Sequence, residues 1–278
     1  MTGTKQNLSR RSAAAKTRKQ NKWIQAIVLA VFFIVWQLVT IANVREGWFN
    51  PVFLPAPTTI VATAASYLAQ GKLLGHIGIS LYRLLTGFAI GTLLAVVLGS
   101  LMALFRKVNN LLSPIINLFG PIPVLAFLPM FLIWFGIGEN SKITLIAYTT
   151  VIAMLPYVLD GIRGTDSLLV RSALSLGASG FQVFWHVLAP AALSNIFSGM
   201  KACLGLAFSS LVVAEMMGAS SGLGFIIVDS KNWFKLADMF MSAIIIGLLY
   251  TGFFAVLTAA ERLLFRWKKS GLDSAVEN

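Results

Sequence analysis

The sequence predicts an all-α integral membrane protein with six transmembrane helices. Of its 278 residues, 57% are hydrophobic and only 12% are charged, whereas a soluble domain carries about 25% charged residues. Long apolar segments recur along the chain, and basic residues are concentrated in the connections on one side of the predicted membrane. A soluble all-helical protein is the alternative, and the low charge content argues against it.

Six segments have the length that a spanning helix needs, which is about 20 mainly apolar residues. They cover approximately residues 24–42, 80–105, 113–135, 142–160, 192–215 and 240–263. The chain is therefore divided into a basic tail (1–22), a transmembrane domain (23–267) with a loop at 161–190, and a second tail (268–278). The first apolar run is longer than a signal-peptide core, so we expect an uncleaved span.

The distribution of basic residues predicts the orientation. With both termini in the cytoplasm, fifteen of the 22 Lys and Arg residues lie on the inner side and five on the outer side, as the positive-inside rule requires. Seven of them precede the first span without an intervening acid. Such a tail is typical of a topology signal that contacts anionic headgroups. The net charge of +12 therefore does not indicate a nucleic-acid partner.

The outer connection at 43–79 contains LPAPTTI (Leu54–Ile60). This motif predicts an extended turn, followed by a short surface helix over about 60–70 that Thr58 or Thr59 caps. The other long outer segment, at 216–239, contains glycines that indicate turns rather than a phosphate-binding loop.

The second span carries small residues at every fourth position, namely Gly87, Gly91, Ala95, Gly99 and Ala103. These positions form a stripe along one face of a helix, where close backbone approach supplies packing energy in a membrane. The stripe indicates either a packed inner helix or the contact between two copies of the chain.

The third span is interrupted by Pro114, Pro121, Pro123 and Pro129. Each proline removes a backbone donor and disturbs the preceding turn. The freed carbonyl groups must face protein or a water-filled cavity. Broken helices at membrane depth often line a transport pathway, although a merely kinked packing helix is the alternative.

Three charged residues lie within predicted spans: Arg83, Lys201 and Glu215. Charges there must be paired, snorkelling or in contact with water. Arg83 and Glu215 are expected at a similar depth, so they form an ion pair with each other, or Arg83 or Lys201 contacts an anionic substrate.

The sequence offers no set of residues for catalysis or metal binding. Cys203, His76 and His186 are isolated, and the ten acidic residues form no convincing carboxylate pair within a span. No phosphate-binding loop is present. We therefore expect no catalytic residue, no metal site and no cofactor bound by this chain, which argues against an intramembrane enzyme.

The loop at 161–190 contains RSALSLGASGFQVFWHVLAP (residues 171–190). Thr165 or Asp166 is expected to cap a helix over about 167–176. Gly177 would then follow the end of that helix, Ser179 would cap a second short helix, and Pro190 would open the fifth span. One face of the first helix carries Leu169, Ala173 and Leu176. An exposed apolar helix of this kind is expected to dock into a partner.

This loop resembles the cytoplasmic coupling loop of binding-protein-dependent ABC importer permeases, with its pattern E-A-A, three residues, G, nine residues, I-x-L-P. The sequence Arg171-Ser172-Ala173 stands at E-A-A, Gly177 at the glycine, Val187 at the aliphatic position and Ala189-Pro190 at L-P. Arg171, Ser172 and Ala189 depart from the pattern. Further segments resemble the nitrate/sulfonate/taurine class of these permeases from about residue 51 to 265, among them SLYRLLTGFAIGTLLAVVLGSLMAL, PIPVLAFLPMFLIWFGIGENSKI and VVAEMMGASSGLGFII.

The resemblance implies the type I permease fold and a bacterial cytoplasmic membrane location. It implies a second permease copy, two cytosolic ATPase subunits that use ATP and Mg, and an extracytoplasmic binding protein. The solute would be a small anion such as a sulfonate, taurine or nitrate. A vitamin precursor or another heteroaromatic solute is the alternative, and an ATP-independent carrier or channel is a more distant one.

The resemblance also assigns the coupling residues. The expected ATPase-coupling residues are Asp166, Leu169, Arg171, Ser172, Ala173, Leu176, Gly177, Ala178, Val187 and Pro190. The broken third span and the charges within spans supply the candidates for the translocation pathway, which are Arg83, Pro121, Pro123, Pro129, Lys201 and Glu215. The family has an acid where this chain has Arg171, so we expect a compensating acid on the ATPase.

Overall fold

The computed structural model describes residues 2–265, and the side chains from Trp23 onward except that of residue 26. The basic side chains of the predicted tail 1–22 and the whole tail 268–278 lie outside this description. Every regular element of the described chain is helical. The elements are α1 (Thr2–Glu46), η1 (Pro51–Phe53), α2 (Pro57–Ala69), α3 (Lys72–Leu104), α4 (Arg106–Phe119), α5 (Val124–Phe135), α6 (Glu139–Arg163), α7 (Ser167–Ser175), α8 (Gly180–Val183), η2 (Phe184–Leu188), α9 (Ala189–Gly218), α10 (Leu223–Asn232) and α11 (Leu236–Leu264).

The predicted number of spans is confirmed within residues 2–265. Five helical segments are long and apolar enough to cross a membrane, and a bent pair makes the sixth. The five are Trp23–Glu46, Lys72–Leu104, Glu139–Arg163, Gly180–Gly218 and Leu236–Leu264. Most extend beyond the predicted limits, because polar and charged residues continue the helices past the apolar core that composition detects.

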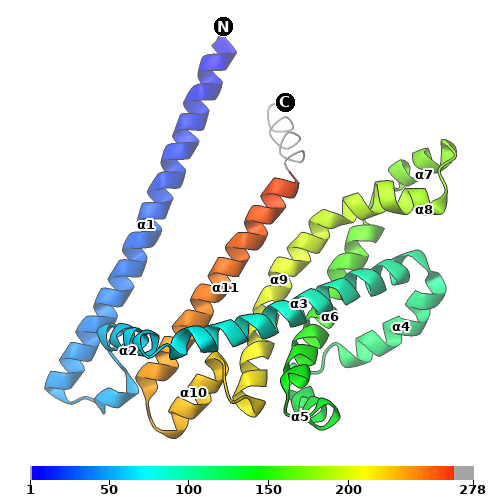
Figure 1. The fold of residues 1–278 in the computed structure, drawn as a ribbon. Coiled ribbons are helices and arrows are strands. Elements are labelled where there is room, and N and C mark those ends of the chain that lie inside the picture. The colour runs from blue at the N-terminus through cyan, green and yellow to red at the C-terminus, as the bar shows by residue number, and fades with distance from the viewer. Residues whose placement is uncertain (1, 266–278) are drawn as a thin grey trace.

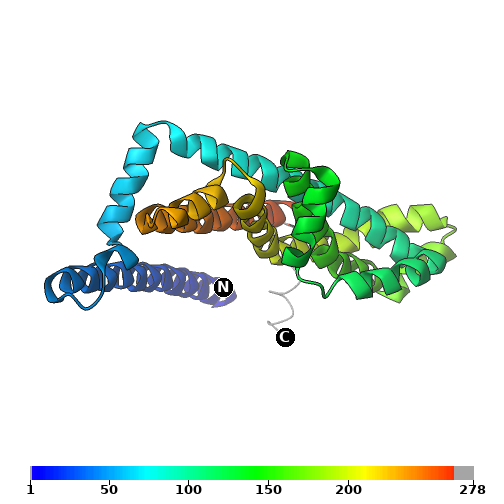
Figure 2. The same cartoon turned by 90° about the horizontal axis from the view of Figure 1, so that it is seen from below.

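The ends of the spans lie in two groups (Figure 1). The first residues of α1, the end of α11 and the pair α7–α8 lie at one end of the molecule, and α5 and α10 lie at the opposite end. The view from below shows α1 set apart from the other helices, with α2 leading from it to α3 (Figure 2). This alternation agrees with an even number of spans.

Helices α3, α6 and α9 form the core, and α3 and α6 have the most extensive contact. The stripe of small residues lies in this contact. Cβ atoms built on Gly87, Gly91 and Gly99 would stand 2.6 to 2.8 Å from atoms of α6, which is closer than side chains tolerate. The packed inner helix is therefore confirmed, and the stripe is not available as a contact between copies.

The third span consists of two helices. Helices α4 and α5 are bent by 104° across residues 120–123. Pro121 and Pro123 lie in this break, and neither can donate a backbone hydrogen bond. Pro114 and Pro129 lie inside α4 and α5 instead, so two of the four prolines account for the bend.

Two predicted helix starts are wrong. Helix α2 begins at Pro57 with Ala56 as its N-cap, so Thr58 and Thr59 lie in the first turn and do not cap it. Pro57 suits the first helical position because the missing N–H has no partner there in any helix.

The fifth span likewise begins earlier than predicted. It is helical from Gly180 and passes through Pro190 without a break. The π-helical turn η2 lies within this span just before Pro190, and the Ala189 N–H donates to Phe184 O. The wider turn accommodates a proline that would otherwise interrupt the helix.

Candidate functional site

The loop between α6 and α9 has the two-helix form that its sequence predicts. The Asp166 side chain caps α7 by accepting from the Leu168 N–H at 2.8 Å. Gly177 has a φ of 84°. The Gly177 N–H donates to Leu174 O at 3.0 Å and the Ala178 N–H to Ala173 O at 3.1 Å. These two bonds define a Schellman motif, which requires left-handed backbone at position 177.

The second helix is short, and its start is capped. Ser179 and Gln182 form a reciprocal capping box at the start of α8, which satisfies two backbone donors that would otherwise be free. Capping at both helices makes the loop a defined surface rather than a flexible linker.

Apolar side chains are exposed over this whole surface. Leu176 is 89% exposed and Phe181 is 74% exposed. Other exposed apolar side chains of the same surface are Leu168, Leu169, Leu174 and Trp185. Contiguous exposed apolar surface of this kind marks a binding interface. We call residues 166–187 the coupling surface.

Five of the predicted coupling residues line one cavity of about 400 Å³ between α7 and η2. They are Ala173, Leu176, Gly177, Ala178 and Val187. The other five lie around it: Asp166 caps α7, Leu169, Arg171 and Ser172 are exposed on α7, and Pro190 lies at the start of α9. Gln182 and His186 also line the cavity and were not predicted.

Arg83 is the centre of a charge network at the opposite end of the molecule. Only 1% of its surface is exposed. Its Nη2 donates to Glu139 Oε1 at 2.7 Å, and its Nη1 donates to Glu215 Oε1 at 2.8 Å and to Ser221 O at 2.7 Å. The predicted ion pair is thus present, and one guanidinium joins α3, α6 and α9.

Glu215 also orders the chain that follows α9. Its Oε1 accepts from the Ser80 hydroxyl at 2.7 Å, and its Oε2 accepts from the Gly224 N–H at 2.8 Å. The hydroxyl of Ser80 in turn accepts from the Leu223 N–H. A carboxylate near the N-terminus of α10 is electrostatically favourable. Arg83 and Glu215 are therefore both buried and paired in this conformation.

Lys201 has a carboxylate partner as well. Its Nζ lies 2.7 Å from Glu261 Oε2 on α11, and both side chains are about four-fifths buried, with exposed fractions of 20% and 23%. The pair joins α9 to α11. A role for Lys201 as a free cation in the pathway therefore requires that this pair opens.

A cavity of about 550 Å³ lies beside the break between α4 and α5. Pro121 and Pro123 line it together with residues of α6 and α9, whereas Pro129 does not. Its polar lining consists of Asn117, Tyr148, Thr149 and Ser209, and none of the lining residues in the described part of the chain is charged. The broken helix therefore borders a cavity among spanning helices, as expected for a pathway.

The structure therefore separates the six predicted pathway residues. Two line the cavity, two form the Arg83 network, Lys201 pairs with Glu261, and Pro129 lies inside α5. Glu139 and Glu261 were missed as partners. Matching opposite charges at similar predicted depth would have found Glu139, since it and Arg83 both lie near the outer ends of predicted spans. It would not have found Glu261, which lies near the inner end of the predicted sixth span, whereas Lys201 lies well inside the fifth.

Long apolar helices, a broken span beside a cavity and a capped docking surface define a membrane transport permease. The sequence pattern of the family described as "Binding-protein-dependent transport system inner membrane component" matches residues 91–270, and the chain belongs to this family. Its members are permease subunits of ABC transporters, whose ATPase is a separate subunit.

The chain is 36% identical over 257 residues to a Bacillus subtilis (strain 168) protein described as an aliphatic sulfonates transport permease, SsuC, covering 91% of each chain. It is 36% identical over 248 residues to the taurine transport system permease protein TauC of Escherichia coli (strain K12), covering 86% of this chain and 87% of TauC. The fold matches the inward-facing MetNI methionine ABC transporter with a TM-score of 0.62 at 17% identity, covering 70% of this chain and 97% of that one.

Proposed function

We propose that this chain is the permease subunit of an ATP-driven importer for a small sulfonate-type anion. The observation that carries the proposal is the coupling surface, whose exposed leucines and capped helices are continuous with the long helix Gly180–Gly218. A partner that binds this surface moves one end of a spanning helix directly. The similarity to permeases described for aliphatic sulfonates and taurine supports the solute class.

The proposed assembly contains two copies of this chain, two cytosolic ATPase subunits and an extracytoplasmic binding protein. The ATPase subunits bind ATP and Mg, and dock on the coupling surface of each copy. Their closure on ATP pushes residues 166–188 and opens the opposite side of the permease to the binding protein. ATP hydrolysis and release of the binding protein then return the permease to its starting conformation. Both termini lie in the cytoplasm in this arrangement, on the side of α7 and α8.

The cavity beside the broken span suits a small anion in transit. Its polar groups carry no fixed charge, so binding is weak enough to permit release. The hydroxyls of Tyr148, Thr149 and Ser209 donate to backbone carbonyls, so the Asn117 amide is the side-chain donor that the described lining offers a solute. Helix α5 begins at Val124 in the cavity wall, and the first N–H groups of a helix have no intrahelical acceptor. The described lining of the cavity contains no carboxylate, which favours an anion over a cation.

Transport by the reconstituted complex tests the proposal. The permease, its ATPase and its binding protein are placed in liposomes, and uptake of labelled taurine, alkanesulfonate, nitrate and a heteroaromatic vitamin precursor is measured with and without ATP. We expect ATP-dependent uptake of the sulfonates. Uptake without ATPase subunits would instead identify a carrier or channel, and selective uptake of the heteroaromatic compound would identify the alternative solute class.

A matched pair of variants relates transport to the cavity. Ser209→Leu places an apolar side chain in the cavity lining, and Ser198→Leu makes the same change on α9 outside it. We expect the first change to reduce uptake at least tenfold while ATPase docking is unchanged, and the second to have little effect. Equal uptake by both variants would contradict the assignment of the pathway.

A further inference from the structure

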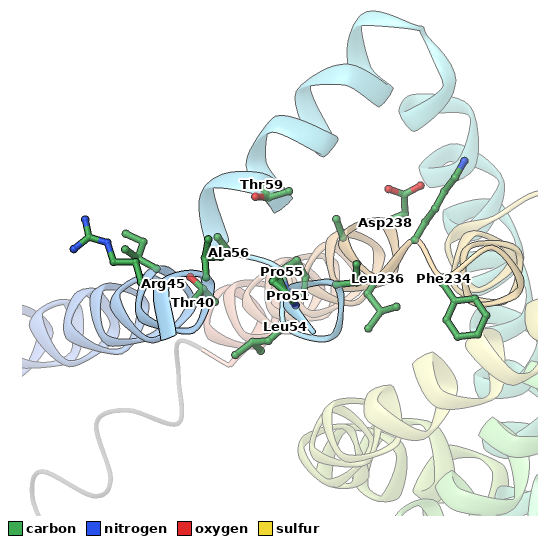
Figure 3. A pocket seen from close by; sticks show the side chains of 15 residues that line it. Thr40, Arg45, Pro51, Leu54, Pro55, Ala56, Thr59, Phe234, Leu236 and Asp238 are labelled. Atoms are coloured by element: carbon green, nitrogen blue, oxygen red, sulfur yellow. The ribbon is translucent and has the colours of Figure 1, made fainter. Parts of the chain in front are cut away.

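A second large cavity lies at the end of the molecule opposite α7 and α8 (Figure 3). Its volume is about 580 Å³, and it lies between the end of α1, the segment with η1, the start of α2 and the residues just before and in the first turn of α11. None of the residues that line it belongs to the coupling surface or to the cavity beside α4 and α5. Because the spanning helices end here, the cavity lies at the level of a membrane surface.

The walls of this cavity are held by hydrogen bonds. Asn43 is 1% exposed. Its side chain donates to Phe49 O at 3.0 Å and accepts from the Phe49 N–H at 2.9 Å, which fixes the turn after α1. Gln37 Oε1 accepts from the Thr58 N–H at 3.3 Å, which fixes the start of α2 against α1. The cavity is therefore a built feature rather than a gap between loose segments.

The charge at its edge is positive. Arg45, Lys235 and Asp238 line the cavity, and Asp238 Oδ2 accepts from the Tyr67 hydroxyl at 2.8 Å. Burial and the Asp238 carboxylate raise the pKa of Tyr67 to about 12, so this hydroxyl keeps its proton and continues to donate. Neither Arg45 nor Lys235 forms an ion pair among the residues whose side chains are described. Figure 3 shows the exposed Arg45 at the rim, with its guanidinium turned outward.

An apolar groove continues from the cavity along α1. It has a volume of about 360 Å³, shares Leu54 with the cavity, and is lined otherwise by Phe32, Val35, Trp36, Val39 and Phe240. Since residues 32–39 precede the end of α1, the groove extends toward the membrane interior. A helix with its side chains is about 10 Å across. A groove of about 360 Å³ is therefore better suited to an extended chain, which is thinner than a helix.

Phe234 in the wall of the cavity departs from its local sequence preference. Its φ is 55°. The Phe234 N–H donates to Lys231 O, and the Lys235 N–H donates to Ser230 O. This is a Schellman motif with phenylalanine where glycine is favoured. The ring is 70% exposed, and that of the adjacent Trp233 is 71% exposed. Aromatic side chains at this level are typical of contact with lipid headgroups.

We propose that the cavity and groove bind one anionic phospholipid from the membrane leaflet opposite α7 and α8. Lys235 binds the phosphate of the headgroup, and Arg45 joins it when its guanidinium, which is turned outward in this structure, rotates toward the cavity. An acyl chain lies in the groove beside Leu54, and Phe234 covers the headgroup region. A cationic rim above a wholly apolar groove complements this amphiphile at both ends. Binding of the phospholipid requires that the chain is inserted in a membrane, but it does not depend on which solute is transported. The uptake assay therefore tests the proposed function separately.

Native mass spectrometry of the full chain tests this site. The protein is released from nanodiscs that contain equal amounts of dioleoyl phosphatidylglycerol and dioleoyl phosphatidylcholine, and the retained lipid is counted. We expect the wild type to retain phosphatidylglycerol preferentially. Each cation near a lipid surface contributes roughly a fivefold gain in binding, so Arg45→Gln with Lys235→Gln should lower retention by about twentyfold.

A control and a second variant distinguish binding at this site from a general attraction of the anionic lipid to positive charge on the protein. Lys231→Gln removes an exposed cation of α10 that does not line the cavity, and we expect unchanged retention. Leu54→Trp fills the junction of cavity and groove, and should reduce retention of both lipids while the thermal unfolding midpoint stays close to that of the wild type. Equal retention of the two lipids by the wild type would overturn the proposal, as would cross-linking of Leu54→Cys to a second copy.

Discussion

Arg83 shows how a charge is accommodated among the ends of spanning helices. An isolated buried charge is very unfavourable, but a charge with several well-placed partners is tolerated. Two carboxylates and the Ser221 carbonyl accept from its guanidinium. Because the partners come from different helices, the network fixes the relative positions of α3, α6 and α9 at this end.

The two carboxylates should not be equivalent. Glu215 is fully buried and accepts two further hydrogen bonds, from Ser80 and Gly224, whereas the Glu139 side chain is 41% exposed. We expect Glu215→Ala to lower the free energy of unfolding by about 3 kcal/mol or more, because it leaves buried donors without partners. Glu139→Ala should lower it by about 1 kcal/mol, since water replaces an exposed acceptor. Thermal unfolding of both variants in one detergent measures the difference, and equal midpoints would contradict it.

Of the three residues that depart from the family pattern, Arg171 is the one that changes the charge. It is exposed on α7 and forms no ion pair among the described side chains, so it is available to a partner. We expect Arg171→Glu to weaken ATPase docking by about tenfold, since it turns an attraction across an interface into a repulsion. Reversal of the partnering acid on the ATPase should restore docking.

The control for this experiment is Lys107→Glu, which reverses an exposed charge outside the coupling surface. Docking is measured by binding of the purified ATPase to the permease in nanodiscs. If Arg171→Glu leaves docking and coupled transport unchanged, the charge at position 171 has no role in the interface.

At the scale of elements, two helices end in the same motif with different residues. Gly177 ends α7 without strain, whereas Phe234 occupies the equivalent left-handed position after α10. The sequence predicts the first case because glycine marks such an end. It does not predict the second, since phenylalanine rarely adopts this backbone. Residues that depart from local preference are often held there by function.

Substitutions at Gly177 test the turn between α7 and α8, which we call the elbow of the coupling surface. No atom lies within 4 Å of a Cβ built there, so a side chain affects only the backbone. We expect Gly177→Ala to destabilise the elbow by about 1 kcal/mol and Gly177→Val by more, with weaker ATPase docking in the same order. Gly180→Ala, also in open space and with ordinary φ, should dock normally. Normal docking by the valine variant would show that the elbow geometry is dispensable.

The contact between α3 and α6 depends on the missing side chains of its glycines. A Cβ on Gly91 would lie 2.6 Å from Ala147 O and from Thr150 Cβ. We expect Gly91→Leu to force the helices apart and lower the unfolding midpoint strongly, since overpacking of this kind costs about 1–3 kcal/mol or more. Gly78→Leu lies on the same helix with nothing within 4 Å, and should be neutral. If the unfolding midpoints of Gly91→Leu and Gly78→Leu are equal, Gly91 does not lie in a tight contact between α3 and α6.

How much the sequence predicts depends on the range of the interactions involved. Spans and caps follow from apolar length and from residues such as Asp166 and Ser179, because these interactions are local. The bend between α4 and α5 follows only in part, since four prolines could each have produced it and neighbouring helices decide which do. The partners Glu139 and Glu261 lie 56 and 60 residues from the cations that they bind, and no local pattern encodes such contacts.

At the scale of the whole molecule, helix α1 has a different environment from the other spans. Only 6% of its apolar window is buried, compared with 50% for Glu139–Arg163. A spanning helix so little covered by its own chain is surrounded by lipid or by another subunit in the membrane. Helices α3, α6 and α9 pack together as the core that continues into the coupling surface, and α1 stands beside them with the cavity at its end.

The arrangement of the spans predicts which residues face which side of the membrane. The natural Cys203 is 1% exposed, so it provides a low background for labelling by a membrane-impermeant maleimide. Leu176 on the coupling surface is 89% exposed, and Trp48 and Trp233 at the other end are 62% and 71% exposed. With both termini in the cytoplasm, Trp48→Cys and Trp233→Cys should be labelled from outside, and Leu176→Cys only after the membrane is opened. Labelling of Leu176→Cys in sealed cells would place the coupling surface outside, where no ATPase could reach it, and the proposed function would fail with it.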